Sequence, residues 1–151
     1  GNTVKLSDSD GKFRFLSFIF TRCPMPNMCP ALLYKQRYLA ETLSDKNIEI
    51  IMISFDYIHD TPQILKNTYE STFSGHENWQ MWSSHKHLDD LYRLTKQIMF
   101  GFWGVEENDI GDNMRCVLLG PNRKLVNTYD GLDWLPKDAK NQIEKIMKAS
   151  S

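Results

Sequence analysis

The chain has 151 residues, enough for one compact core, and we expect a single domain over residues 1–151. Hydrophobic residues make up 41% and charged residues 25%, a mixture typical of globular proteins and not of disordered chains. The formal net charge is -1 and the basic residues are scattered, which argues against a nucleic-acid partner. The longest largely apolar run spans only Phe15 to Phe20, far short of the roughly 20 residues that cross a bilayer.

The first half of the chain predicts a strand, a loop, a helix and a second strand. Residues 13–20 are rich in aromatic and aliphatic side chains, which predicts a strand that is buried on both faces. Residues 21–30 contain several prolines, so they predict a structured loop. Good helix formers dominate residues 31–44, and this helix is expected to begin at or near Cys29–Pro30. The β-branched run 48–55 predicts a second buried strand, parallel to the first.

The second half predicts helices and a closing hairpin. The sequence Asp60-Thr61-Pro62 is typical of a capped helix start with proline at the first position. Apolar residues spaced three and four apart predict another helix over 88–99. Residues 115–119 and 124–129 predict two strands joined by a turn, and a last helix is expected over 136–147. This order predicts an α/β, thioredoxin-like domain with a central mixed sheet and flanking helices.

Two of the three cysteines, Cys23 and Cys29, lie in the predicted loop and at the predicted helix start. The positive end of a helix dipole lowers the pKa of a thiol, so Cys29 is expected to be activated. The intervening residues can fold back to bring both sulfurs together for a disulfide or a shared soft metal ion, with Arg22 adding positive charge. The alternative is a pair of unrelated buried cysteines. Cys116 falls in a predicted strand and is expected to be a buried, inert thiol.

Several short motifs resemble those of the Sco/SenC family, and they occur in the family's order over nearly the whole chain. They are Phe20-Thr21-Arg22-Cys23-Pro24, Cys29-Pro30, Ser54-Phe55-Asp56, Asp60-Thr61-Pro62, Leu118-Leu119-Gly120-Pro121 and Tyr129-Asp130-Gly131. The resemblance implies a thioredoxin-like, extracytoplasmic protein that binds copper and helps to build the dinuclear copper centre of cytochrome c oxidase. It implies as partner the copper-bearing subunit of that oxidase or another cysteine-containing protein. We expect membrane contact only through a segment that is not present in this chain.

The resemblance also implies a metal site of two cysteines and one histidine, in which Cys23 and Cys29 match the cysteines. The family's usual cysteine pair is separated by three residues, whereas five residues separate this pair. The ligand histidine would lie nine residues before Pro121, where this chain has Asp112. A carboxylate is a hard donor, so copper affinity is expected to fall unless another group completes the site. Further candidates for a third ligand are Met25, Met28, Met114, His59, His76, His85 and His87.

Four functions are compatible with these residues. The first is a copper-site assembly factor that holds the ion between Cys23 and Cys29. The second is a thiol–disulfide oxidoreductase, in which one cysteine attacks a partner disulfide and the other resolves the mixed disulfide. A peroxidase centred on Cys23, with Arg115 approaching it, ranks third. The fourth is a binding module that has lost its metal site. The copper-site assembly factor ranks first, and Asp112 in place of the histidine adds support to the second and fourth functions.

Overall fold

Two parallel strands, β1 (Phe13–Ile19) and β2 (Ile48–Ser54), form the centre of the structure, as predicted. The computed structural model describes residues 3–22 and 28–150, with the backbone alone at positions 28 and 29. Every residue of both strands is buried, because helices cover both faces of the sheet. The five-stranded sheet has the order β3-β2-β1-β6-β7 and also contains β3 (Trp79–Ser83), β6 (Arg115–Leu119) and β7 (Leu125–Asp130).

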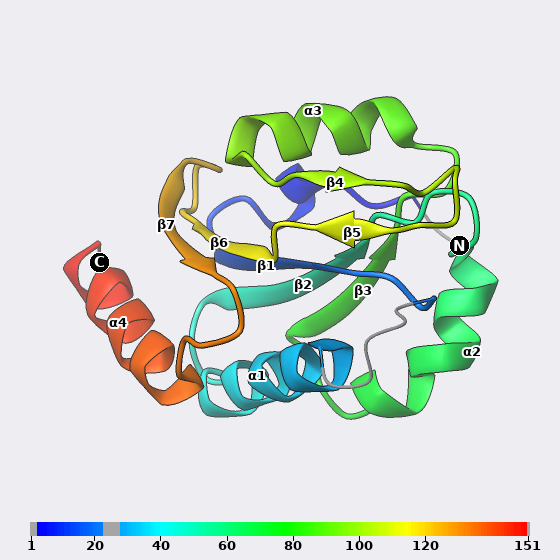
Figure 1. Ribbon diagram of the computed structural model, residues 1–151. Coiled ribbons are helices and arrows are strands. Elements are labelled where there is room, and N and C mark those ends of the chain that lie inside the picture. Colours follow the sequence, from blue (N-terminus) through cyan, green and yellow to red (C-terminus); the bar gives the residue numbers. More distant parts are fainter. Residues whose placement is uncertain (1–2, 23–27, 151) are drawn as a thin grey trace.

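The sheet is mixed. Strand β3 extends the parallel part beside β2, whereas β6 is antiparallel to β1 and β7 is antiparallel to β6. Helices α1 (Met28–Thr42), α2 (Pro62–Phe73) and α4 (Pro136–Ala149) pack on one face, and α3 (Leu88–Ile98) packs on the other, as Figure 1 shows. A mixed sheet between helices confirms the predicted α/β class.

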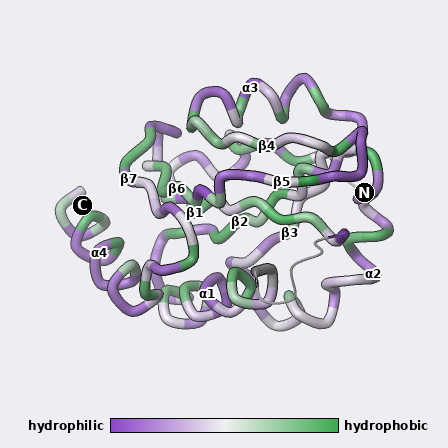
Figure 2. The backbone as a smooth tube through the Cα atoms, viewed as in Figure 1, coloured by the Kyte–Doolittle hydropathy of each residue, from purple (hydrophilic) through white to green (hydrophobic). Residues whose placement is uncertain are grey.

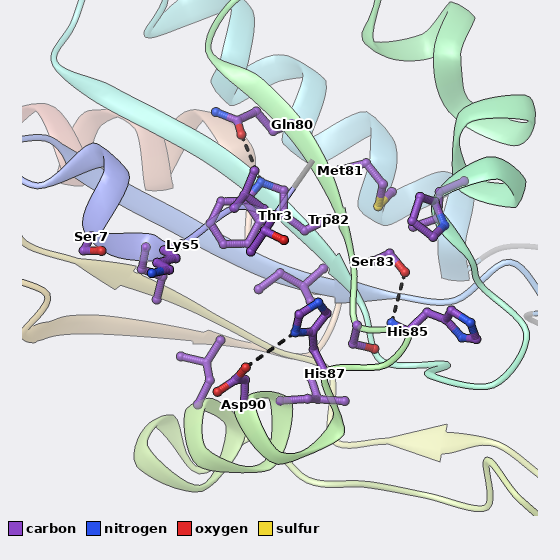
Figure 3. Close-up of a pocket in the computed structure, with 18 of the residues that line it drawn as sticks. Thr3, Lys5, Ser7, Gln80, Met81, Trp82, Ser83, His85, His87 and Asp90 are labelled. Carbon is purple, nitrogen blue, oxygen red and sulfur yellow. Dashed lines mark hydrogen bonds and ion pairs between the residues drawn. The ribbon is translucent and has the colours of Figure 1, made fainter. Parts of the chain in front are cut away.

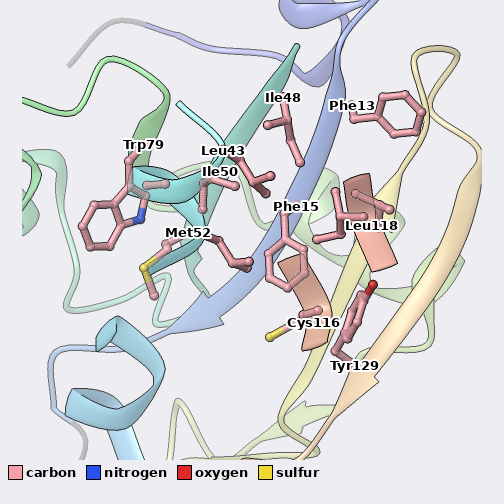
Figure 4. Close-up of a cluster of buried hydrophobic side chains, with 14 of the residues drawn as sticks. Phe13, Phe15, Leu43, Ile48, Ile50, Met52, Trp79, Cys116, Leu118 and Tyr129 are labelled. Atoms are coloured by element: carbon pink, nitrogen blue, oxygen red, sulfur yellow. The ribbon is translucent and has the colours of Figure 1, made fainter. Parts of the chain in front are cut away.

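Side chains of the central strands alternate between two hydrophobic clusters. On β1, Phe15 and Ile19 face the helices α1, α2 and α4, whereas Leu16 and Phe18 face α3. Figure 4 shows the first cluster, in which the ring of Phe15 lies 5.4 Å from that of Tyr129. Figure 2 shows the same distribution along the chain, with hydrophobic stretches in the central strands. The prediction of strands buried on both faces is therefore confirmed.

The other predicted elements are confirmed with small shifts at their ends. Helix α2 has the predicted cap, since the side chain of Thr61 accepts a hydrogen bond from the Ile64 amide and Pro62 is its first residue. Across residues 3–22 and 28–150, no helix has the length and apolar character needed to cross a membrane.

Four elements were not predicted from the sequence. They are strand β3, the two-residue strands β4 (Phe102–Trp103) and β5 (Gly111–Asp112), which pair with each other, and the short 3-10 helix η1 (Leu6–Ser9). Strand β3 contains the polar residues Gln80 and Ser83, so it lacks the apolar run of a central strand. It forms because its backbone pairs with β2, with Trp79 opposite Ile50.

Candidate metal centre

Of the two predicted sulfur ligands, the structure describes only the backbone of Cys29. Helix α1 begins at Met28, so Cys29 lies in its first turn, close to where the sequence predicted the helix to start. A thiol in a first turn is near amide groups that carry the positive end of the helix dipole. Cys23 and the side chain of Cys29 lie outside the part of the chain that the structure describes, so their pairing stays a prediction.

The third predicted site residue, Asp112, lies near the end of β1 that leads to Cys23. Strand β6 is antiparallel to β1, with Val117 opposite Leu16, so β6 begins where β1 ends. Asp112 lies shortly before β6 and pairs with Phe102 across the β4–β5 ladder. A small cavity here is lined by Phe18, Ile19, Phe20, Leu32, Asp112, Met114, Arg115, Cys116, Gly131 and Leu132. The fold thus brings Asp112 together with the end of β1 and the first half of α1.

The environment of Asp112 disfavours its charged form. Burial raises the pKa of this carboxyl, and a hydrogen bond that Oδ1 accepts from the Met114 amide at 2.6 Å opposes the rise. Ionisation of this carboxyl group is costly, and the carboxylate that it forms is a hard donor. It therefore suits Cu(I) less well than a neutral imidazole would. The residue present at this position therefore fits copper only weakly.

Met114 is a soft donor at the same cavity. It is 37% exposed and has a left-handed backbone, with a φ of 53°, between β5 and β6. Among the methionines proposed as third ligands, Met25 and the side chain of Met28 lie outside the described residues. Thioether sulfur is a suitable ligand for Cu(I), and among the described alternatives to Asp112 it is Met114 that lines the same cavity.

The four candidate histidines occupy other parts of the fold. They lie in the connections that flank α2 and β3: His59, His76, His85 and His87. His85 Nδ1 lies 2.9 Å from the carbonyl oxygen of Tyr57, which accounts for one ring nitrogen. No histidine is among the described residues that line the Asp112 cavity. Within residues 3–22 and 28–150, no group of three or more His, Cys, Asp or Glu side chains could hold a metal ion.

Both arginines that the sequence placed near the cysteines are paired with aspartates. Arg22 donates from Nε and Nη2 to the two carboxylate oxygens of Asp56, at 2.7 and 3.0 Å, and this contact raises the pKa of Arg22. Arg115 makes a similar two-point contact with Asp130, at 2.8 and 3.1 Å. A buried carboxylate therefore balances the charge of Arg22, and the expectation that Arg22 adds positive charge beside the cysteines stays a prediction, because the sulfurs lie outside the described residues.

Cys116 is free and buried, as predicted. Its side chain lines the same cavity as Asp112. Burial raises the pKa of the Cys116 thiol, and the neighbouring carboxylate of Asp112 raises it further. Since the thiolate is the reactive form, the environment keeps this sulfur in its unreactive form.

Cys116 is expected to resist alkylation in the folded protein. In a Cys23→Ser/Cys29→Ser background, iodoacetamide at pH 8 is expected to label Cys116 at least about 100-fold more slowly than a new exposed cysteine introduced by Ser74→Cys. Because the folded pKa exceeds that of an unfolded thiol, the stability contributed by this group is complete below about pH 8.5 and falls at higher pH. Mass spectrometry of timed samples gives both rates. Equal labelling of the two positions in the native protein would contradict the inert role.

A large groove among the described residues lies at another edge of the sheet. It has a volume of about 1550 Å³ and runs along strand β3 between α2 and α3, with Lys5, Trp82 and His87 on its walls (Figure 3). None of its described lining residues belongs to β1 or α1. Its size therefore does not identify it as the site of the cysteine chemistry.

A buried polar network beside the cysteine loop was missed by the sequence analysis. Asp56 and Asp60 entered there only as parts of motifs, yet both are fully buried and both bind the segment that leads to Cys23. The available signal was two aspartates, four residues apart, directly after a strand predicted to be buried. Charged side chains at such positions are rarely buried without a partner.

Comparisons with known proteins agree with this architecture. The model of the SCO1/SenC family matches residues 1–148. Similar solved structures include BsSco, a member of the Sco family of cytochrome c oxidase assembly proteins with a disulfide switch (22% identity, TM-score 0.77, 98% of this chain and 87% of the other covered). Copper-bound yeast Sco1 has 22% identity and a TM-score of 0.72, with 93% and 78% covered. A SCO1/SenC family lipoprotein from Bacillus anthracis has 20% identity and a TM-score of 0.77, with 91% and 83% covered.

These likenesses establish the fold and confirm the predicted thioredoxin-like class. The fold match extends to the thioredoxin domain of a thiol-disulfide oxidoreductase from Bacteroides vulgatus, with 22% identity, a TM-score of 0.59 and 97% and 87% covered. A comparison with curated proteins finds no match.

Proposed function

The chain belongs to the SCO1/SenC family, and from this premise we propose that it binds copper through Cys23 and Cys29 and serves in assembly of the dinuclear copper centre of cytochrome c oxidase. The observation that carries the proposal is the strand-to-helix junction. Helix α1 starts at Met28, so the backbone of Cys29 lies in its first turn, a position at which a helix dipole generally favours the thiolate form of a cysteine. Two thiolates form a soft donor pair that suits Cu(I).

Copper is the cargo in this proposal, and the third donor comes from the cavity beside the end of β1. Asp112 occupies the position of the family's histidine, and Met114 lines the same cavity. The hard, partly buried carboxylate weakens the site for Cu(I), which favours release of the ion to a partner. The partner is the copper-bearing subunit of the oxidase or another cysteine-containing protein. The lipoprotein among the similar structures supports an extracytoplasmic location.

Thiol–disulfide exchange is the second candidate function, and Asp112 in place of the histidine favours it. In this reaction, one cysteine thiolate attacks a partner disulfide, forms a mixed disulfide and releases one partner thiolate. The second cysteine then attacks the mixed disulfide, which leaves a disulfide in this chain and a fully reduced partner. The disulfide switch of BsSco is a property of that protein, and it supports testing the same cysteines here.

An anaerobic titration with Cu(I) against a chromogenic chelator tests the copper proposal. The reduced chain is expected to bind one ion, and Asp112→His is expected to tighten binding by about tenfold, or about 1.4 kcal/mol, because imidazole replaces a hard donor. Asp109→His is the matched control, since Asp109 is exposed in the segment that leads to β5. Binding seen only in Asp112→His would contradict a copper function and leave thiol–disulfide exchange as the function.

A further inference from the structure

Thr21, the second residue after β1, is held by a buried carboxylate. The amide of Thr21 donates to Oδ2 of Asp60 at 2.9 Å, and the hydroxyl of Thr21 donates to Oδ1. Asp60 is fully buried and lies just before helix α2. Both oxygens of one carboxylate thus bind one residue, which restrains its backbone and its side chain together.

The next residue is held by a second buried carboxylate. The guanidinium of Arg22 binds both oxygens of Asp56 in a two-point contact, and its Nη1 donates to Asn108 at 3.0 Å. Asp56 is fully buried, whereas the Arg22 side chain is 29% exposed. Such a planar contact restrains orientation as well as distance.

Asp60 is itself anchored to the sheet, and its backbone is bonded to that of Asp56. Ser54, the last residue of β2, donates from its hydroxyl to Asp60 Oδ2 at 2.6 Å. The hydroxyl of Ser83, the last residue of β3, donates to the Asp60 carbonyl oxygen at 2.6 Å. The Asp60 amide donates to the carbonyl oxygen of Asp56 at 3.1 Å. These hydrogen bonds therefore tie the segment 56–60 to the last residues of β2 and β3.

We propose that Asp56 and Asp60 are positioning residues that set how closely Cys23 can approach Cys29. We call the contacts of Asp60 with Thr21 and of Asp56 with Arg22 the clamp. Cys23 directly follows Arg22 in the sequence, and Cys29 lies in the first turn of α1. The clamp limits the positions open to the first thiol, and so it raises the effective concentration of one thiol at the other. This inference rests on the proposed function insofar as both cysteines act together on a copper ion or in a disulfide.

The chemistry explains why two buried carboxylates are useful at this place. A buried ion pair costs desolvation, and an apolar replacement often stabilises a protein equally well, so folding alone does not require one. Effective concentrations depend steeply on geometry, and a displacement of about 1 Å can cost about 100-fold in a reaction between positioned groups. Anchors with two contacts to each clamped residue reduce such displacements.

The variant Thr21→Val tests the clamp, because it keeps the shape of the side chain and removes the hydroxyl that binds Asp60. Arg22→Lys is the parallel variant for Asp56, since it keeps the charge and loses the two-point contact. Thr21→Ser restores a hydroxyl. Thr42→Val is the matched control, because Thr42 is also half-buried and its hydroxyl donates to the Tyr38 carbonyl oxygen at the far end of α1.

Two measurements on each variant separate positioning from stability. One is the equilibrium of the metal-free protein with reduced and oxidised dithiothreitol, which gives the effective concentration of the two thiols when the disulfide forms and dithiothreitol is reduced. The other is the affinity for Cu(I) against a chelator. Thr21→Val and Arg22→Lys are each expected to lower both values by about tenfold, with Thr21→Ser and Thr42→Val close to the unsubstituted chain. Urea unfolding curves show whether a lower Cu(I) affinity or a lower effective thiol concentration results from partial unfolding of the variant.

The results distinguish failure of the clamp from failure of the proposed function. Unchanged thiol equilibrium in Thr21→Val and Arg22→Lys overturns the clamp, and so does an equal loss in Thr42→Val. If the unsubstituted chain binds no Cu(I), the copper function fails while the dithiothreitol equilibrium still decides the role of the clamp. A chain that neither binds Cu(I) nor forms the disulfide overturns both.

Discussion

Cys23→Ser and Cys29→Ser are each expected to weaken Cu(I) binding at least about 100-fold, or about 2.7 kcal/mol. A serine hydroxyl remains protonated at neutral pH and is a hard donor, so it replaces neither the charge nor the softness of a thiolate. Competition with a chromogenic chelator under anaerobic conditions measures the affinity. Both variants are expected to lose Cu(I) affinity, because the two sulfurs share the ion.

Cys116→Ala is the matched control for these variants. It also removes one sulfur, but from a position that is only 2% exposed and has a raised thiol pKa. Its Cu(I) affinity is expected to equal that of the unsubstituted chain. A loss in Cys116→Ala that equals the loss in Cys23→Ser would place the metal on Cys116 and contradict the proposed site. Retention of full affinity in either Cys→Ser variant would exclude a shared site.

Arg14→Met is expected to lower the free energy of unfolding by about 3–5 kcal/mol. Arg14 is fully buried at the start of β1. Its guanidinium donates to the carbonyl oxygens of Gly120 and Leu6 at 2.8 and 2.7 Å, and to the hydroxyl of Ser9 at 2.8 Å. Methionine fills much of the same space but leaves these acceptors without their donor. The expected loss is a large share of the roughly 5–15 kcal/mol that stabilises a typical domain.

Arg123→Gln is the control for Arg14→Met. Arg123 and Arg14 both pair with Asp10, but the side chain of Arg123 is 54% exposed. An exposed ion pair contributes about 0–1 kcal/mol, so Arg123→Gln is expected to leave the unfolding curve almost unchanged. Unfolding in guanidinium chloride, followed by circular dichroism, measures the free energy of unfolding of both variants. Equal midpoints for the two variants would show that the contacts of Arg14 contribute no more than a surface pair.

Most helices and strands were predictable because their signals are local. The proline-capped start of α2 depends on three neighbouring residues, and the buried strand β1 depends on a continuous apolar run. Strand β3 was missed because its own residues signal weakly and it depends on pairing with β2. The strands β4 and β5 have two residues each, too few to show the alternation of apolar and polar residues that predicts a strand.

The candidate site was predictable only in part. Cysteine chemistry at Cys23 and Cys29 is predicted from residue type and from the helix start, and the structure confirms only that helix α1 begins at Met28. The pairing of Arg22 with Asp56 could not be predicted from the sequence, because the two residues are 34 positions apart along the chain. The pattern of short motifs pointed to Asp112 as the residue in the histidine position, but not to its cavity with Met114.

Residue pattern alone was enough to predict the α/β class and the helix start that carries Cys29, and the family resemblance predicted Asp112 at the histidine position. These features depend on neighbouring residues, whose propensities act before distant contacts form. Folding in three dimensions was needed to bury Asp56 and Asp60 beneath Thr21–Arg22 and to balance the charge of Arg22. Such contacts join residues 34 and 39 positions apart, and their strength comes from exclusion of water by the packed sheet, which no local pattern encodes.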